Sequence, residues 1–329
     1  MSSQKLSTYE RIGLVLKYFD IRLKKRPIMM TLEVTKRCNA RCDFCDHWKT
    51  KKETHLDDFL PIVQGVNPLV VTISGGEPTI RKDLPQIIQR IRENIRFVYL
   101  VLLTNGSLMT MEKAQALCDA GLNIISFSLN YLDDRQDKER GIEGLSSHLS
   151  NLIPQLCNAG INVSLNTVIM KDNLTQLVPI AKQAHQWRVK VGYSCYEILQ
   201  GANPDHFIQQ EEQLKELQQI INELLKLKST FNSITNSRYY LKKVITFFRN
   251  GGHLAGCQAK RKFVHVSQDG YLKPCANQPS YMHYSEYKPS RKLSEPVSCD
   301  QCWEACRGEM EASLTFERAW ELIAHFPYA

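Results

Sequence analysis

A regular alternation of β-type runs and helical segments between residues 29 and 197 is the feature that most restricts the fold. Runs rich in β-branched and apolar residues lie at 30–35, 69–74, 97–103, 123–129, 162–170 and 189–198, and helical patterns separate them near 57–65, 83–94, 110–120, 145–159 and 173–187. Six strands that alternate with helices predict an α/β fold. We expect a parallel sheet with right-handed crossovers, open or curled toward a barrel, with its chemistry at the carboxyl ends of the strands.

The rest of the chain divides around this alternation. Gly, Asn and Pro interrupt the pattern in 201–210, and further helices are expected at 211–228, 236–249 and 309–325. We therefore expect five segments: an N-terminal amphipathic helix (1–27), a barrel (28–205), a helical linker (206–252), a cysteine-rich module (253–310) and a closing helix (311–329).

The N-terminal segment is apolar at helical spacing and strongly basic. Its apolar positions predict an amphipathic helix over 8–25 that packs on the body; they are Ile12, Val15, Leu16, Phe19 and Leu23. Lys and Arg outnumber Asp and Glu by 13 to 5 in residues 1–52, whereas residues 53–329 carry 29 of each. Positive charge confined to one end of the chain does not indicate a nucleic-acid-binding face, and we expect no nucleic-acid partner. A phospholipid or other acidic partner is the alternative to a solvated basic end.

Eleven cysteines indicate metal binding. No apolar run approaches the roughly 18 residues that span a bilayer, and no secretory signal is present, so we expect a cytoplasmic protein without a transmembrane segment. In that compartment thiols stay reduced, which excludes a disulfide framework.

Three of the cysteines, Cys38, Cys42 and Cys45, share the loop after the first strand in a C-x3-C-x2-C spacing. Three thiolates can hold three irons of a [4Fe-4S] cluster and leave the fourth iron open for substrate chemistry. A zinc site with His47 as fourth ligand is the alternative that the spacing leaves open.

This loop resembles the signature of the radical S-adenosylmethionine (SAM) superfamily, including Phe44 just before the third cysteine. The segment that closes the second strand resembles the GGEP motif of that family; its residues are Gly75, Gly76, Glu77 and Pro78. The resemblance implies that the motif contacts the amino group of SAM. Glycines permit a close backbone approach, and a carboxylate can accept a charge-assisted hydrogen bond from the ammonium.

The resemblance implies further SAM contacts on the later strands, to the ribose and carboxylate. The candidates are polar residues of the fourth and fifth strands: Ser126, Ser128, Asn130 and Asn166. Each of them could equally satisfy a buried backbone group.

The cysteine-rich end resembles the SPASM/twitch extension of this family, which houses an auxiliary [4Fe-4S] cluster. Cys257 and Cys275 fit a C-x12-G-x4-C pattern, and Cys299 and Cys302 form a later C-x2-C. The resemblance implies that these four thiolates ligate one auxiliary cluster, with Cys306 as a spectator or substitute ligand. A structural zinc site is the alternative.

Taken together, the resemblance implies a radical SAM enzyme with a partial (β/α)6 TIM-like barrel. Such an enzyme takes an electron from a donor such as flavodoxin or ferredoxin, cleaves SAM reductively and uses the 5′-deoxyadenosyl radical to abstract a hydrogen atom. We expect a small-molecule, sugar or lipid precursor as substrate, because only 37 residues precede Cys38. A ribosomally made peptide is the alternative substrate, and a zinc- or cluster-binding scaffold is the non-enzymatic rival.

Overall fold

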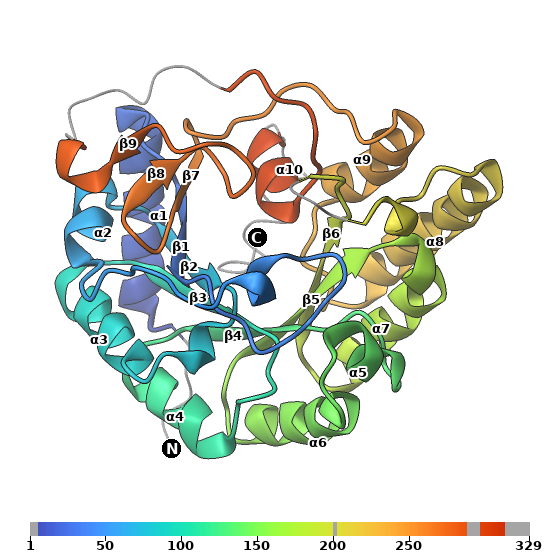
Figure 1. Cartoon of the computed structure of the whole chain (residues 1–329), viewed down its shortest axis with the longest axis horizontal. Coiled ribbons are helices and arrows are strands. Elements are labelled where there is room, and N and C mark those ends of the chain that lie inside the picture. Colours follow the sequence, from blue (N-terminus) through green and yellow to red (C-terminus); the bar gives the residue numbers. More distant parts are fainter. Residues whose placement is uncertain (1–5, 200–202, 288–296, 313–329) are drawn as a thin grey trace.

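The computed structural model describes residues 6–199, 203–287 and 297–312. Six parallel strands curve around a central space, and helices cover them from outside (Figure 1). The strands are β1 (Met29–Thr35), β2 (Val70–Gly75), β3 (Tyr99–Thr104), β4 (Ile124–Ser128), β5 (Val163–Ile169) and β6 (Lys190–Cys195). They pair in the order of the sequence, so the predicted α/β partial barrel is confirmed.

Helices separate the strands as the sequence predicts. The crossover helices are α2 (Leu60–Val66), α3 (Leu84–Asn94), α4 (Met111–Asp119), α5 (Arg135–Arg140), α6 (Leu145–Asn158) and α7 (Leu174–Gln186), followed by α8 (Glu211–Thr230) and α9 (Arg238–Arg249). Short 3-10 turns lie at η1 (His47–Lys49), η2 (Pro78–Ile80), η3 (Lys171–Asn173), η4 (Pro204–His206) and η5 (Tyr284–Glu286). The short α5 is the only helix of the barrel region described here that the sequence pattern did not predict.

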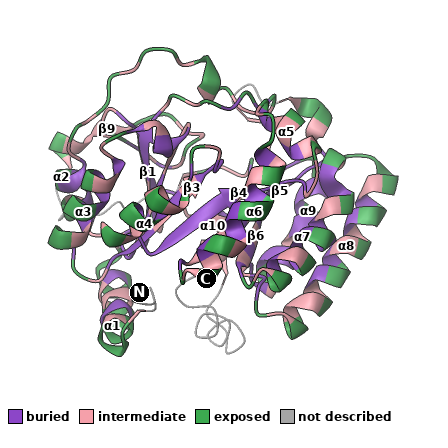
Figure 2. Cartoon of the chain, turned by 90° about the horizontal axis from the view of Figure 1, so that it is seen from below, coloured by how far each residue is buried: buried purple, intermediate pink, exposed green. Residues whose placement is uncertain are grey.

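Alternation along the strands separates the core from the site. On β5, Val163 and Ile169 are buried, whereas Ser164, Asn166 and Val168 line a central cavity. Successive side chains of a strand point to opposite faces, so Val163 and Ile169 pack under the helices and the alternate residues face inward. In Figure 2 the strands are mostly buried, and exposed residues lie on the outer helices.

The cysteine-rich segment continues the barrel sheet. Strand β7 (Phe263–Val266) pairs in parallel with β1, and β8 (Tyr271–Lys273) and β9 (Met282–His283) extend the sheet in antiparallel fashion. The nine strands follow the order β6-β5-β4-β3-β2-β1-β7-β8-β9. The segment that we expected as a separate module is therefore hydrogen-bonded to the first strand of the barrel.

The N-terminal helix α1 (Thr8–Lys24) is present, but it packs through other side chains than its apolar stripe. Leu14 and Ile21 are buried in a small apolar cluster with Ile28 and Leu69. Gly13 of this helix lies close to the body, because a Cβ atom there would lie 2.1 Å from the ring of Phe97. The stripe described by the sequence is instead exposed: Ile12 55%, Val15 44%, Leu16 64%, Phe19 55% and Leu23 83%. The close contact at Gly13 therefore selects the face that packs.

A short helix that the sequence pattern did not predict ends the described part of the chain. Helix α10 spans Ala305–Glu311, and most of the helix expected at 309–325 lies outside the described residues. Within the described part of the chain, no helix is both long and apolar enough to cross a membrane.

A pair of glycines provides a test of packing beside β3. Gly106 and Gly160 both have a φ of +82°, but a Cβ on Gly106 would lie 2.6 Å from Leu149 and Phe127, whereas Gly160 has nothing within 4 Å. Alanine in this left-handed conformation costs about 1–2 kcal/mol at either position. We expect Gly106→Ala to lose a further ~1–3 kcal/mol through overpacking. Urea unfolding of both variants measures the difference, and equal losses would contradict this account.

Candidate active site

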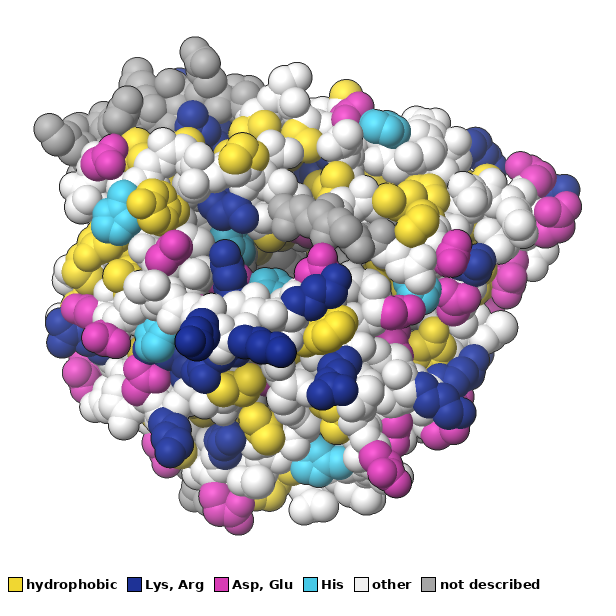
Figure 3. All heavy atoms as spheres, in the orientation of Figure 1, with side chains coloured by type: hydrophobic (Ala, Val, Ile, Leu, Met, Phe, Trp, Pro, Cys, Tyr) yellow, Lys and Arg dark blue, Asp and Glu magenta, His cyan; other side chains and the backbone are white. Residues whose placement is uncertain are grey.

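A cavity of about 1500 Å³ occupies the centre of the barrel. Figure 3 shows the corresponding hollow, with several Lys and Arg side chains around it. Polar and sulfur-bearing side chains from the strands line it, among them Glu33, Ser74, Ser126, Asn166 and Cys195. These residues lie in the carboxyl halves of their strands, where parallel α/β barrels place their chemistry.

The three cysteines of the first loop lie together beside this cavity, and Cys45 lines it. Burial raises the pKa of the Cys38 thiol to about 11, and the neighbouring sulfurs add to that effect. A thiolate at this position therefore needs a compensating cation. One positive group is already present, because Nη1 of the buried Arg140 lies 3.5 Å from Sγ of Cys42.

Two glycines hold the cysteine loop against the end of β2. The backbone N–H of Gly76 donates to the carbonyl of Thr35, and that of Glu77 donates to the carbonyl of Arg37, both at 2.8 Å. A Cβ on Gly75 would lie 2.1 Å from the Thr35 oxygen, and one on Gly76 would lie 2.1 Å from the Arg37 oxygen. Only glycine therefore allows this approach.

The carboxylate of Glu77 joins the ends of β2 and β3. It accepts hydrogen bonds from the backbone N–H and hydroxyl of Thr79 (3.1 and 2.6 Å), the hydroxyl of Thr104 (2.7 Å) and the backbone N–H of Asn105 (2.7 Å). Glu77 is 1% exposed, and the adjoining Pro78 is buried in η2. The carboxylate thus positions the loops around the cavity. Its expected contact with the SAM ammonium stays a prediction.

The structure brings some of the predicted SAM contacts together and separates others. Phe44, Gly75, Ser126 and Asn166 line the cavity. Neither Ser128 nor Asn130 occurs among the described residues that line it. The side chain of Asn130 donates to the Glu139 carboxylate and accepts from the backbone of Val168. Asn130 therefore satisfies internal groups, as one of our two interpretations allowed.

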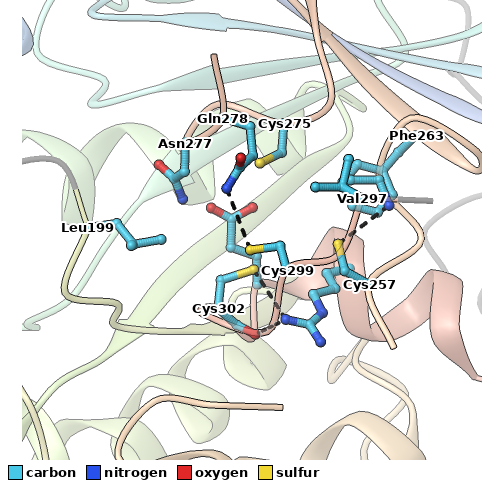
Figure 4. Close-up of a pocket in the computed structure, with 12 residues that line it drawn as sticks. Leu199, Cys257, Phe263, Cys275, Asn277, Gln278, Val297, Cys299 and Cys302 are labelled. Carbon is cyan, nitrogen blue, oxygen red and sulfur yellow. Dashed lines mark hydrogen bonds between the residues drawn. The ribbon is translucent and has the colours of Figure 1, made fainter. Parts of the chain in front are cut away.

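Four cysteines of the C-terminal segment surround a second, smaller cavity. Its lining includes Cys257, Cys275, Cys299 and Cys302, and Figure 4 shows their sulfur atoms around a common space. Cys257 precedes β7, Cys275 follows β8, and the other two lie just before α10. The pairing of β7 with β1 fixes this cavity to the barrel.

N–H groups point at three of these sulfurs. Cys257 accepts from the backbone of Ala259 at 3.4 Å, Cys299 from the Gln278 amide at 3.5 Å, and Cys302 from the Arg307 guanidinium at 3.8 Å. The Arg307 side chain has no exposed surface. Burial raises the pKa of the Cys257, Cys275 and Cys302 thiols, and the N–H donors and Arg307 oppose this only in part. Thiolates in this cavity therefore need a further compensating cation, as at Cys38.

Cys306 belongs to the wall between the two cavities. It lines the central cavity, and its thiol donates to the Glu304 carboxylate at 3.3 Å. Glu304 lines both cavities. Burial and the negative charge of Glu304 raise the pKa of Glu197 well above its usual range, and Glu197 accepts a hydrogen bond from Asn277. The half-buried acidic pair of Glu197 and Glu304 therefore lies where the two cavities meet.

A polar cluster of β1, β7 and η1 was not predicted from the sequence. Glu33 is 4% exposed, and its carboxylate lies 3.4 Å from Nε2 of His265 and 3.6 Å from Nδ1 of His47. Burial alone would raise the pKa of Glu33, but the hydrogen bond and charge of His265 hold it below its usual range. All three residues line the central cavity. The only sequence signal was a charged residue inside an apolar strand.

The positions of the candidate ligands can be compared with what the two alternative zinc sites require. In residues 6–199, 203–287 and 297–312, no three His, Cys, Asp or Glu side chains converge closely enough to hold a single metal ion. His47, the residue considered as a fourth zinc ligand, faces Glu33. The four C-terminal thiols instead line a cavity.

A histidine connects the cysteine loop to the segment after β6. Nε2 of His206 lies 2.9 Å from a carboxylate oxygen of Asp43, and its Nδ1 lies 2.6 Å from one of Asp172. Its ring packs edge-on against Phe44 and Tyr196. Partial burial opposes the charged form of the imidazole, but the two carboxylates raise the pKa of His206.

Comparison with known proteins identifies relatives of this chain in sequence and in fold. Residues 32–184 match the sequence model of the radical SAM superfamily. A probable GTP 3′,8-cyclase of Methanococcus maripaludis is 30% identical over 264 residues, which cover 74% of this chain and 83% of that protein. The Fe-coproporphyrin III synthase of Methanosarcina barkeri is 28% identical over 211 residues, but the match covers 61% of this chain and 51% of that protein.

Among solved structures, Streptococcus suis SuiB bound to its precursor peptide SuiA superposes with a TM-score of 0.65. The two sequences are 17% identical, and the match covers 88% of this chain and 71% of SuiB. At this identity the likeness concerns the fold.

The His206 contacts predict a pH-dependent stability. Because the folded pKa is raised, the contribution is complete below the unfolded value of about 6.5 and is lost as the pH rises through the folded pKa. The melting temperature of His206→Gln should therefore differ most from the parent at acidic pH and least at alkaline pH. His185→Gln, at a ring that stacks on Phe231, is the control. A difference that does not vary with pH would assign His206 to packing alone.

Proposed function

Because the chain belongs to the radical SAM superfamily, whose enzymes use a [4Fe-4S] cluster and SAM, we propose that Cys38, Cys42 and Cys45 hold that cluster. The observation that carries this proposal is the loop of three thiols, held by the backbone N–H groups of Gly76 and Glu77 at the edge of the central cavity. When bound, the cluster and SAM supply a 5′-deoxyadenosyl radical that abstracts a hydrogen atom.

The protein residues then bind and orient. The Arg140 guanidinium donates to one cluster thiolate and compensates its charge. Ser126 and Asn166 offer polar atoms to SAM from the inner faces of β4 and β5. Glu77 keeps the glycine loop and the end of β3 in register through its four hydrogen bonds.

The cluster of Glu33 and His265 is our candidate for substrate binding. It lies on the β1–β7 side of the cavity, and its charge and hydrogen-bonding atoms suit a polar substrate group. The remaining wall carries apolar side chains such as Leu103 and Val168. This combination supports a small-molecule, sugar or lipid precursor as substrate. A peptide is the second candidate, because the structural neighbour SuiB binds one.

We further propose that Cys257, Cys275, Cys299 and Cys302 ligate an auxiliary [4Fe-4S] cluster. Four thiols around one cavity, with Arg307 buried beside them, fit a cluster better than a zinc ion, whose four thiolates would all lie about 2.3 Å from one point. When bound here, such a cluster would supply a one-electron acceptor beside the central cavity, which would favour oxidation or bond formation.

The first test removes the thiols of the barrel loop. Cys38→Ala, Cys42→Ala and Cys45→Ala should each lose about four irons per chain and stop 5′-deoxyadenosine formation with dithionite, because three thiolates are needed to hold a site-differentiated cluster. Cys118→Ala, in α4, is the matched control and should keep both properties. Formation of 5′-deoxyadenosine by all three loop variants would overturn the assignment.

The second test counts iron in variants of the C-terminal segment. Alanine at Cys257, Cys275, Cys299 or Cys302 should lower the iron content from about eight to about four and leave some 5′-deoxyadenosine formation, because the two clusters are ligated separately. Cys306→Ala should keep about eight irons. We expect this because its thiol faces Glu304 and the central cavity. Zinc without iron in this segment of anaerobically prepared protein would contradict the auxiliary cluster.

A further inference from the structure

The apolar stripe of α1 is a continuous exposed surface. Ile12, Leu16, Phe19 and Leu23 follow one another by four, three and four residues, so they lie on one side of the helix. They are 55%, 64%, 55% and 83% exposed, while the opposite side packs on the barrel. Single exposed apolar residues are ordinary, but a contiguous patch marks a binding surface.

Charge indicates what this surface binds. Residues 5–26 contain seven Lys or Arg and two Asp or Glu, a net charge of +5. Arg11, Arg22, Lys24 and Lys25 are exposed around the stripe. A helix with an apolar stripe and a cationic surround lies in the interface of an anionic membrane. A second copy of α1 would bring like charges together, which disfavours dimer formation through this face.

The barrel cavity extends to the same helix. Val15 and Phe19 line the cavity, although both are also partly exposed on α1. Residues at the amino ends of the strands, such as Val70 and Ile124, line it as well. The cavity therefore runs the length of the barrel, from the cluster loop at one end to α1 at the other. Figure 2 shows α1 at the edge of the molecule.

We propose that α1 docks on an anionic phospholipid membrane and that the substrate carries an apolar chain, which reaches the barrel cavity from the α1 side. The stripe enters the headgroup boundary, Arg11 and Arg22 contact lipid phosphates, and the chain lies along the apolar wall of the cavity. The proposal that the protein docks on a membrane depends only on the observations made on α1. The substrate class rests on the proposed function.

Vesicle sedimentation tests the docking. Full-length protein, reconstituted anaerobically, is spun with vesicles of phosphatidylglycerol and phosphatidylcholine, and in parallel with vesicles of phosphatidylcholine alone. It should bind the anionic vesicles and release them as salt is added. The double variant Leu16→Ser, Leu23→Ser should bind about a hundredfold more weakly, since two leucine side chains leave the apolar layer.

The control variant is Tyr271→Ser, which removes a side chain that is 43% exposed on β8, and it should bind as the parent does. Equal binding by the parent and the double variant would overturn the proposal. So would a dimer that the double variant loses in the absence of vesicles, because that result would assign the stripe to a second copy. Leu16 and Leu23 are not among the described residues that line the cavity, so 5′-deoxyadenosine formation should not change.

A fluorescent fatty acid tests the substrate class. The parent should bind the probe with SAM present, and Val70→Trp should weaken probe binding at least tenfold by filling the α1 end of the cavity, while SAM binding persists. Unchanged probe binding would refute the apolar chain. If the parent binds vesicles and probe but makes no 5′-deoxyadenosine, the proposed function fails and the docking stands.

Discussion

The contact between the Gly75-Gly76 backbone and the loop after β1 is the constraint on which the site depends. A Cβ atom on Gly75 or Gly76 would lie 2.1 Å from the carbonyl oxygen of Thr35 or Arg37, so neither position has room for a side chain. The cysteine loop therefore follows the end of β2 at a fixed distance. Glu77 transmits this position to β3 through Thr104 and Asn105. Three strand ends therefore form one rigid unit, and the cavity wall inherits its shape from them.

The sequence predicts a helix or strand well when the element is long and its apolar residues recur at a regular spacing. The six strands and their crossover helices are of this kind, and the structure places them close to the predicted ranges. Strand β7 has four residues inside a cysteine-rich segment, and its partner β1 begins the barrel. No local pattern encodes that pairing. The same holds for Glu33 and His265, which are 232 positions apart.

The spacing of the cysteines in the sequence identified both candidate metal sites, but it did not predict the residues around them. The N–H donors near the sulfurs include Arg140, 98 positions from Cys42, and Gln278, 21 positions from Cys299. Tertiary structure alone brings such donors to a sulfur. Likewise, periodicity identified the apolar residues of α1, but the face that packs was decided by the close approach of Gly13 to Phe97. The spacing of apolar residues indicates which residues share one face of a helix, but it does not indicate what that face contacts.

The parallel pairing of β1 with β7 has a consequence for the order in which the chain folds. During synthesis β1 leaves the ribosome among the first elements, and its second edge stays unpaired until residue 266 has followed. Pairing across so many residues is slow, and an open strand edge is prone to aggregation. The thiols of the loop after β1 can come together before that edge closes, whereas the second thiol cavity cannot exist before then. The topology of the sheet thus sets the order in which the two groups of thiols are brought together.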